Sequence, residues 1–241
     1  MDFSILDFFL SLLVITLSAV VQAATGLGAG LLIVPLLALI HFDLVPGPVI
    51  FGSLALTALM SYRGRRDIRY AGMSALLPGL VAGMIVGALT VSYVPPASLG
   101  LVFGMLIILA VVLSARGLRV AFKPSVLVAA GVLSGFMGTT AAVGAPILAL
   151  LYQHEEGKTL RATLAFLYLL SSVLMLLMLH LVGYFSSDHM VLGVYLMPGF
   201  VLGYVLAQRL TRQLDSGYTR PAVLMVSVVS ALVLILKSAV F

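Results

Sequence analysis

The chain has 241 residues, of which 62% are hydrophobic and 9% are charged, and its mean hydropathy is +1.24. A soluble domain of this size could not expose so apolar a surface to water, so the composition predicts an all-α polytopic membrane protein. The net charge of +5 does not indicate a nucleic-acid partner, because the basic residues lie in short loops between apolar segments. The absence of cysteine excludes disulfides and thiolate chemistry, and we expect no cofactor and no metal.

The first apolar run extends from Phe8 to Ile40 without a charged residue. A single α-helix of that length would measure about 50 Å, whereas the hydrocarbon core of a bilayer is about 30 Å thick. The run contains Thr25-Gly-Leu-Gly-Ala-Gly30, where glycines predict that the helix breaks. Broken helices are tolerated at membrane depth only where protein or a cavity satisfies the backbone, and in transporters they hold the substrate. The sequence therefore predicts a hairpin at 4–40 with a binding site at its break.

The apolar segments that follow predict transmembrane helices and a second hairpin. Helices are expected at 46–62, 71–93 and 97–115, a hairpin at 125–153, and further helices at 162–183, 190–207 and 221–240.

Loop charges predict which side of the membrane each loop faces. Lys and Arg concentrate at 63–69, 116–123 and 209–220, whereas the turns near 43, 95–96 and 188–189 have none. The positive-inside rule places the first group in the cytoplasm and the second outside. Three apolar segments separate Lys123 from Arg209, although only an even number of crossings can join two cytoplasmic points. One of the three must enter and leave on the same side, and 125–153 has its own break at Gly138 to Pro146. Both chain termini are then external.

Two motifs recur and predict an internal duplication. Leu76-Leu-Pro-Gly-Leu-Val-Ala-Gly83 returns 120 residues later as Leu196-Met-Pro-Gly-Phe-Val-Leu-Gly203, and Thr25–Gly30 aligns with Ala141–Pro146 at an offset of 116. Each half, 1–120 and 121–241, then contains one re-entrant hairpin and three helices. An odd number of crossings per half makes the two repeats inverted, which is a common transporter plan.

The two breaks suit a small anion. Half-helices beginning after Gly30 and near Ala145, with Pro146 at a first-turn position, would point their N–H groups and positive dipole ends at each other near the midplane. The apolar segments have no charged residue near their centres, and a metal cation would require carboxylates. The predicted site consists of Gln22, Thr25, Gly26, Gly28 and Gly30 from the first break and Thr139, Thr140, Gly144 and Ala145 from the second.

Other polar and small residues have a structural and a functional interpretation. Gly79, Gly83 and Gly87 share one helix face and are expected to mediate close packing. Ser53 and Ser171 either face the cavity or bond to their own helix. His180 is a candidate for proton coupling because it is ionisable and intramembrane, although it lies near the outer interface, where it would simply meet water.

The same residues resemble the sulfite exporter TauE/SafE family over essentially the whole chain. Val20-Val-Gln-Ala-Ala-Thr-Gly-Leu-Gly-Ala-Gly30 with Pro35 resembles the family's first signature, and Ser134-Gly-Phe-Met-Gly-Thr-Thr140 with Pro146 and Leu150-Leu-Tyr-Gln153 resembles the second, followed by Leu160-Arg-Ala-Thr163. The resemblance implies movement of small sulfur-containing or carboxylated anions across the bacterial inner membrane. Many relatives have Thr-Gly-Ile-Gly-Gly-Pro-Pro where this chain has Ala141-Ala-Val-Gly-Ala-Pro-Ile147, so the second break has lost a hydroxyl, glycines and a proline.

The function that these features favour is secondary transport of a small oxyanion or organosulfonate by alternating access, with the lipid bilayer as the surroundings. An anion channel on the same fold is an alternative, as is a subunit or anchor without transport. An intramembrane enzyme is disfavoured, because no nucleophile with a base or set of metal ligands is evident. The sequence leaves open the substrate, the coupling ion and whether the chain forms a homo-oligomer.

Overall fold

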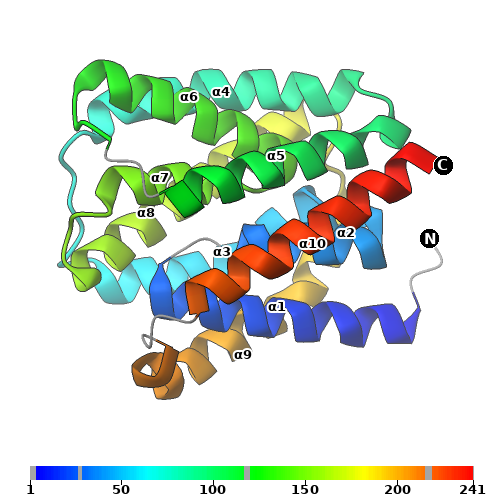
Figure 1. The fold of residues 1–241 in the computed structure, drawn as a ribbon, viewed down its shortest axis with the longest axis horizontal. Coiled ribbons are helices and arrows are strands. Elements are labelled where there is room, and N and C mark those ends of the chain that lie inside the picture. The colour runs from blue at the N-terminus through cyan, green and yellow to red at the C-terminus, as the bar shows by residue number, and fades with distance from the viewer. Residues whose placement is uncertain (1–3, 27–28, 117–119, 215–218, 241) are drawn as a thin grey trace.

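The computed structural model describes residues 4–26, 29–116, 120–214 and 219–240, and these residues form helices and no strand. The all-α prediction is therefore confirmed. In chain order the helices are α1 (Ile5–Thr25), α2 (Gly30–Ile40), the short 3-10 helix η1 (Phe42–Leu44), α3 (Gly47–Gly64), α4 (Met73–Tyr93), α5 (Pro96–Arg116), α6 (Pro124–Ala141), α7 (Ala145–Tyr152), α8 (Gly157–Leu181), α9 (Ser187–Leu214) and α10 (Thr219–Val240). Figure 1 shows them in a bundle whose long helices run roughly along one direction.

Each predicted hairpin is a long helix followed by a short one. The helix α1 ends where Gly26 adopts a left-handed φ of +75°, and α6 ends where Ala142 adopts a φ of +52°. These two residues are 116 positions apart, the offset at which the two break motifs align. In each case the N–H of the left-handed residue donates to the carbonyl four residues earlier, at 2.8 Å. The short helices α2 and α7 begin at Gly30 and Ala145, as the sequence predicted.

The arms of the hairpins are unequal in length. Among the described residues, seven helices are long and apolar enough to cross a membrane: α1, α4, α5, α6, α8, α9 and α10. The second arms are short, with 11 residues in α2 and eight in α7, which correspond to only about 16 Å and 12 Å. The predicted crossing helix α3 is not in the set of seven. It contributes the polar residues Ser53, Thr57 and Ser61 and packs between α8 and α9, so it needs less lipid-facing apolar surface.

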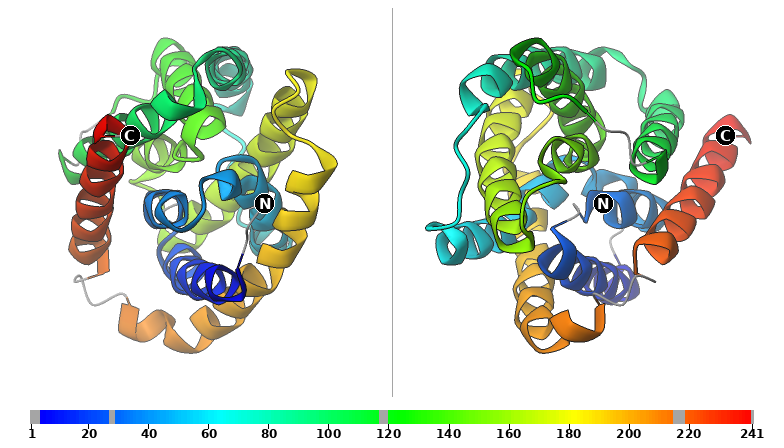
Figure 2. Two further views of the ribbon diagram at one scale, coloured as in Figure 1. Left: turned by 90° about the vertical axis from the view of Figure 1, so that its right-hand side faces the viewer. Right: turned by 60° about the vertical axis from the view of Figure 1, so that its left-hand side comes forward.

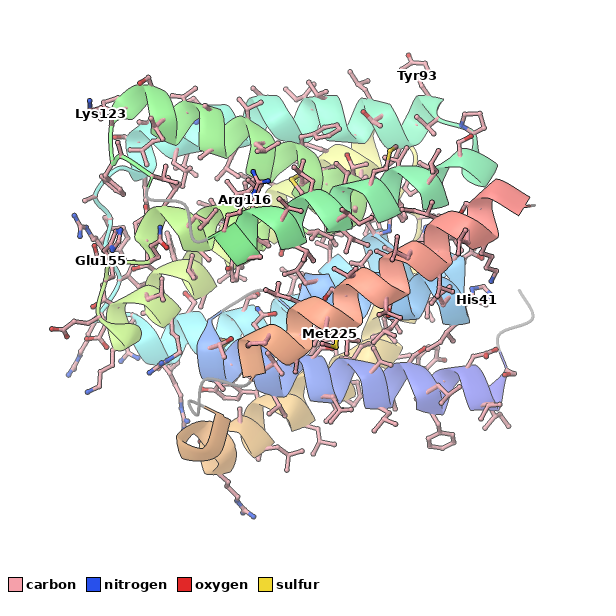
Figure 3. All side chains as sticks on the ribbon, in the orientation of Figure 1. His41, Tyr93, Arg116, Lys123, Glu155 and Met225 are labelled. Carbon is pink, nitrogen blue, oxygen red and sulfur yellow. The ribbon has the colours of Figure 1, made fainter. Side chains whose placement is uncertain are left out.

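The loops gather at two ends of the bundle. At one end the Arg69 guanidinium pairs with Glu155, its backbone N–H donates to the Thr163 hydroxyl at 2.9 Å, and the Phe122 ring packs on Tyr152. We call this region, formed by loops 64–72, 120–123 and 153–156, the basic end. Figure 3 shows Lys123 and Glu155 at this end and His41 and Tyr93 at the opposite end. The first hairpin thus begins and finishes at one end, opposite the basic end (Figure 1).

The glycines expected to mediate packing do so. A Cβ at Gly79 or Gly83 would overlap the carbonyl oxygen of Val128 or Val132 on α6, and one at Gly87 would lie 2.8 Å from that of Phe136. On α9, Gly203 faces α1 in the same way, because a Cβ there would lie 2.6 Å from the Ala19 side chain. Small residues therefore let α4 approach α6, and α9 approach α1, to backbone contact.

The main helix pairs follow one pattern. The helix α1 packs on α9 and α6 on α4, while α3 packs on α8 and α5 on α10; α2 contacts α10 and α7 contacts α5, and α3 also packs on α9 as α8 contacts α4, though less extensively. Exchanging the first five α-helices with the last five leaves these pairs unchanged. Figure 2 shows α9 and α10 outside α1 and α2. The division into repeats 1–120 and 121–241 stays a prediction, which this pattern supports.

Candidate functional site

A cavity lies between the two hairpin breaks, near the middle of α3 and α8. Measured as the space open to the centres of water-sized spheres, its volume is about 80 Å³, whereas a single water needs about 10–15 Å³ by that measure. The cavity therefore has room for a small anion with some of its water. Its polar lining residues are Gln22, Ser53, Thr57, Ser134, Tyr168, Ser171 and Ser172, and the lining found among the described residues includes no charged side chain.

The N-termini of α2 and α7 both reach this cavity. Ala29 and Gly30 line it from the first break, and Gly144 and Ala145 line it from the second. The first N–H groups of a helix have no partner within the helix, and they lie at its positive dipole end. In α7, Pro146 occupies the first turn, where its missing N–H is no loss. The cavity is thus lined by two sources of partial positive charge.

Gln22 holds the first break together across the gap in the helix. Its side chain is buried, and its Oε1 accepts a hydrogen bond from the Ala29 N–H at 2.8 Å. This bond fixes the residue that precedes α2 and satisfies a donor that the break would otherwise leave open. Because Gln22 also lines the cavity, its side chain amide contributes to the site directly.

The two breaks touch each other at Gly30. A Cβ at this position would overlap the carbonyl oxygen of Ala142, and the α-carbon of Val143 would lie 3.6 Å away. Only glycine lets one backbone approach another so closely. The contact joins the start of α2, in the first predicted repeat, to the end of α6, in the second.

Tyr168 of α8 also spans the two breaks. Its hydroxyl lies 3.2 Å from the carbonyl oxygen of Gly26 and 3.4 Å from that of Ala145. A phenolic hydroxyl has one hydrogen, so it donates to one of these acceptors at a time. The ring lines the cavity beside this pair.

Serine side chains provide most of the remaining polar lining. The Ser134 hydroxyl donates to the Gly144 carbonyl at 2.8 Å and so closes the second break. Ser53 donates back to Ile50 within its own helix, at 2.8 Å. Ser171 faces the cavity, and its buried hydroxyl has no hydrogen-bond partner among the described residues. Ser53 therefore both lines the cavity and bonds to its own helix, so the two interpretations of this residue hold together.

Several predicted site residues lie outside the cavity lining. The Thr25 hydroxyl donates to the Val21 carbonyl at 2.8 Å. Gly26 packs against α8, where the Arg161 Cγ would lie 3.1 Å from an added Cβ. Thr139 and Thr140 are fully buried and pack against Gly87 of α4, and their hydroxyls have no hydrogen-bond partner among the described residues. Gly28 lies outside the described residues. The structure therefore gathers Gln22, Gly30, Gly144 and Ala145 at the cavity, but not Thr25, Gly26, Thr139 and Thr140.

His180 lies near the end of α8, away from the cavity. Its side chain is exposed, and its Nδ1 lies 3.1 Å from the Phe185 carbonyl oxygen in the following loop. This position matches the interpretation of a histidine at the interface. A proton-coupling role stays a prediction, and His180 is not among the described residues that line the cavity.

Sequence reasoning missed Tyr168 and Ser134 as lining residues. A tyrosine in the middle of an apolar segment is one signal that could have found the first, because a buried phenol usually needs a partner. Ser134 stands in the second signature motif but was not assigned a role. The side of α8 that meets the breaks depends on how α8 packs against the helices around it, and no local sequence pattern encodes that packing.

A comparison with family models matches residues 11–234 to the model described as Sulfite exporter TauE/SafE. The match covers nearly the whole chain, including both hairpin breaks and all the helices between them. The chain belongs to the sulfite exporter TauE/SafE family. No curated protein and no solved structure gives a significant match.

Membership in the TauE/SafE family confirms the resemblance seen in the signature motifs. Proteins of this family are membrane transporters and not enzymes. Together with the apolar helices, the family makes this chain a multi-pass membrane protein that takes part in anion transport.

Removing the Tyr168 hydroxyl tests the bridge between the breaks. In Tyr168→Phe, the carbonyl oxygen to which the hydroxyl donates loses its donor, so we expect the free energy of unfolding to fall by about 1–3 kcal/mol and the apparent affinity for a transported anion to weaken. The measurements are thermal unfolding and anion binding of the purified protein. Tyr152→Phe is the matched control, because the Tyr152 hydroxyl lies 3.3 Å from the Ala71 carbonyl at the basic end. An equal loss of anion affinity in both variants would contradict a role for Tyr168 at the breaks.

Proposed function

We propose that this chain is a secondary transporter of a small oxyanion, organosulfonate or related carboxylate, which binds in the cavity between the two hairpin breaks. The observation that carries the proposal is the cavity's lining. Two helix N-termini and seven hydroxyl or amide side chains line it, without a charged side chain among the described lining residues. A metal cation would be poorly held there, because it requires anionic oxygen ligands. Helix N-termini stabilise a permanently charged anion without a buried basic residue.

Alternating access between two inverted halves is the mechanism we propose. It is supported by the helix pairs that persist when the halves are exchanged and by the direct contact of the two breaks at Gly30. Rocking one half against the other would open the cavity to one side at a time, as in other transporters built from inverted repeats. The chain carries no nucleotide-binding motif, so the driving force in this proposal is an ion gradient or the gradient of the substrate.

Anion exchange in liposomes tests the transport proposal. Purified protein is first screened by thermal shift against sulfite, sulfate, thiosulfate, sulfoacetate, taurine and simple carboxylates. The anion that stabilises it is then used, radiolabelled, in counterflow. Saturable uptake that unlabelled anion inside the liposomes accelerates supports a carrier. A current that rises in proportion to anion concentration, without saturation or exchange, favours the alternative of a channel.

We also propose that the basic end faces the cytoplasm of a bacterial inner membrane and that both termini are external. The chain has no cysteine, so single-cysteine variants need no prior removal of native thiols. In intact spheroplasts, a membrane-impermeant maleimide should label Asp188→Cys and should label Arg66→Cys only after permeabilisation. The reverse pattern would contradict this orientation, which rests on the positive-inside rule.

A further inference from the structure

A second cavity opens at the basic end, outside the site described above. By the same measure its volume is about 200 Å³, and its lining includes Met60 and Gly64 of α3, Asp67, Lys158 and Arg161 of α8, and Tyr204 of α9. We call it the vestibule. Two positive side chains and one negative one line it, so the lining carries a net positive charge. The Arg63 guanidinium lies 5.8 Å from the centre of the Tyr204 ring and adds a further positive charge nearby.

The basic side chains that line the vestibule have no carboxylate partner among the residues that the structure describes. The ion pairs formed by the described residues join His41 to Asp43 and Arg69 to Glu155. Neither Arg161 nor Lys158 takes part, although Asp67 lines the same cavity. An arginine without an acidic partner in a recess retains its planar set of N–H donors for a carboxylate, sulfonate or similar oxyanion.

Arg161 contacts the first hairpin break from the vestibule side. Its Cγ would lie 3.1 Å from a Cβ at Gly26, and the Gly26 carbonyl in turn is within 3.2 Å of the Tyr168 hydroxyl in the central cavity. The adjacent α1 residues Gln22 and Ala23 line the central cavity and the vestibule respectively. Arg161 and Tyr168 are seven residues apart on α8, which corresponds to about 10 Å. The contact of Gly26 with α8 therefore separates the two cavities.

We propose that the vestibule is a second anion-binding site, in which Arg161 and Lys158 hold a small oxyanion such as sulfite or a sulfonate group before it reaches, or after it leaves, the central cavity. The order in which the anion visits the two cavities rests on the proposed transport function, whereas anion binding in the vestibule does not. Arg161 supplies the hydrogen-bond donors and Lys158 a neighbouring charge. Asp67 limits how strongly the anion is retained, which suits a site that must release its ligand.

The vestibule can be monitored by fluorescence, because the chain contains no tryptophan. Tyr204→Trp introduces a single reporter into the vestibule lining and keeps an aromatic ring for Arg63 to stack on. The variant is reconstituted in nanodiscs and titrated with sodium sulfite at constant ionic strength. We expect a saturable change in emission.

Substitutions on the Tyr204→Trp background test which side chains bind. Arg161→Gln should raise the apparent Kd for sulfite by about tenfold or more, because a charge-assisted hydrogen bond is lost. Arg161→Lys should restore part of the affinity. Arg66→Gln is the matched control. It removes the same charge from an exposed residue of the same end that does not line the vestibule, and its effect should stay below about twofold, as expected for a screened surface charge.

Two results would overturn the vestibule site: emission that changes linearly with sulfite, or equal effects of Arg161→Gln and Arg66→Gln in protein whose thermal unfolding shows it to be folded. If Arg161→Gln does not fold, Arg161→Lys is measured in its place. Unchanged affinity for sulfite in both Arg161→Lys and Lys158→Gln would then overturn the site.

Counterflow distinguishes the vestibule proposal from the transport proposal. A saturable signal without anion exchange would refute transport and retain the vestibule, whereas exchange with a linear signal would refute the vestibule alone.

Discussion

Gln22→Glu is expected to weaken anion binding by about a hundredfold or more while the protein stays folded. Two unit charges 4 Å apart interact by about 4 kcal/mol at an effective dielectric constant near 20, and each 1.4 kcal/mol or so is a factor of ten in Kd. The carboxylate would also occupy the positive end of α2 that we assign to the anion. Since a carboxylate oxygen can accept the hydrogen bond that Gln22 Oε1 receives from Ala29 at 2.8 Å, the break itself keeps its link.

Gln153→Glu is the matched control for this charge. Gln153 follows α7 in the loop at the basic end, so the same chemical change is made on the second hairpin and outside the cavity lining. The measurements are the thermal transition without anion, which should be similar in both variants, and the anion-dependent shift, which should vanish only in Gln22→Glu. Retained affinity in folded Gln22→Glu would place the anion elsewhere and refute the central site.

Gly30→Ala is expected to destabilise the protein strongly and to abolish transport. The added Cβ would overlap the Ala142 carbonyl oxygen, and a backbone atom cannot move aside as the end of a side chain can. Overpacking of this kind usually costs about 1–3 kcal/mol, and here it also separates the two breaks that line the cavity. Thermal unfolding and counterflow measure the two effects.

Gly157→Ala is the control for the glycine substitution. A Cβ at Gly157 would meet only the guanidinium of Arg161, with Nη1 at 3.3 Å, which is the flexible end of a long side chain. Because Gly157 is the first residue of α8, where the helix preference of alanine over glycine has less effect than in a helix interior, this variant should be about as stable as the parent. If Gly30→Ala retained both the parent's stability and its transport, the two breaks could not be in contact as the structure has them.

The close packing of the helices could be predicted from the sequence because small residues at fixed spacing have few other uses in a membrane. Gly79 and Gly83 share a helix face, and both meet the backbone of α6. The starts of α2 and α7 were predictable for a similar local reason. Glycine at Gly26 and proline at Pro146 determine where a helix ends and where the next begins.

The polar residues of the candidate site were predictable only in part. Thr25, Thr139 and Thr140 stand within the break motifs, yet their side chains point away from the cavity or bond to their own helix. A break motif specifies where the backbone opens but not which way each side chain turns. The Thr25 hydroxyl donates to the Val21 carbonyl four residues earlier, a common arrangement for hydroxyls in helices, whereas Thr139 and Thr140 are buried against Gly87 of α4.

The sequence by itself determined that this protein is an all-helical membrane protein of the TauE/SafE family, with two hairpins broken at corresponding motifs. Those features follow from hydrophobicity, glycine and proline positions, which act through neighbouring residues along the chain. Only the tertiary structure decided that Gly30 meets Ala142, that Tyr168 spans both breaks and that Arg161 lies behind Gly26. Most of these contacts join residues 100 or more positions apart. They depend on the orientation in which α8 packs against the two hairpins, which no local sequence pattern encodes.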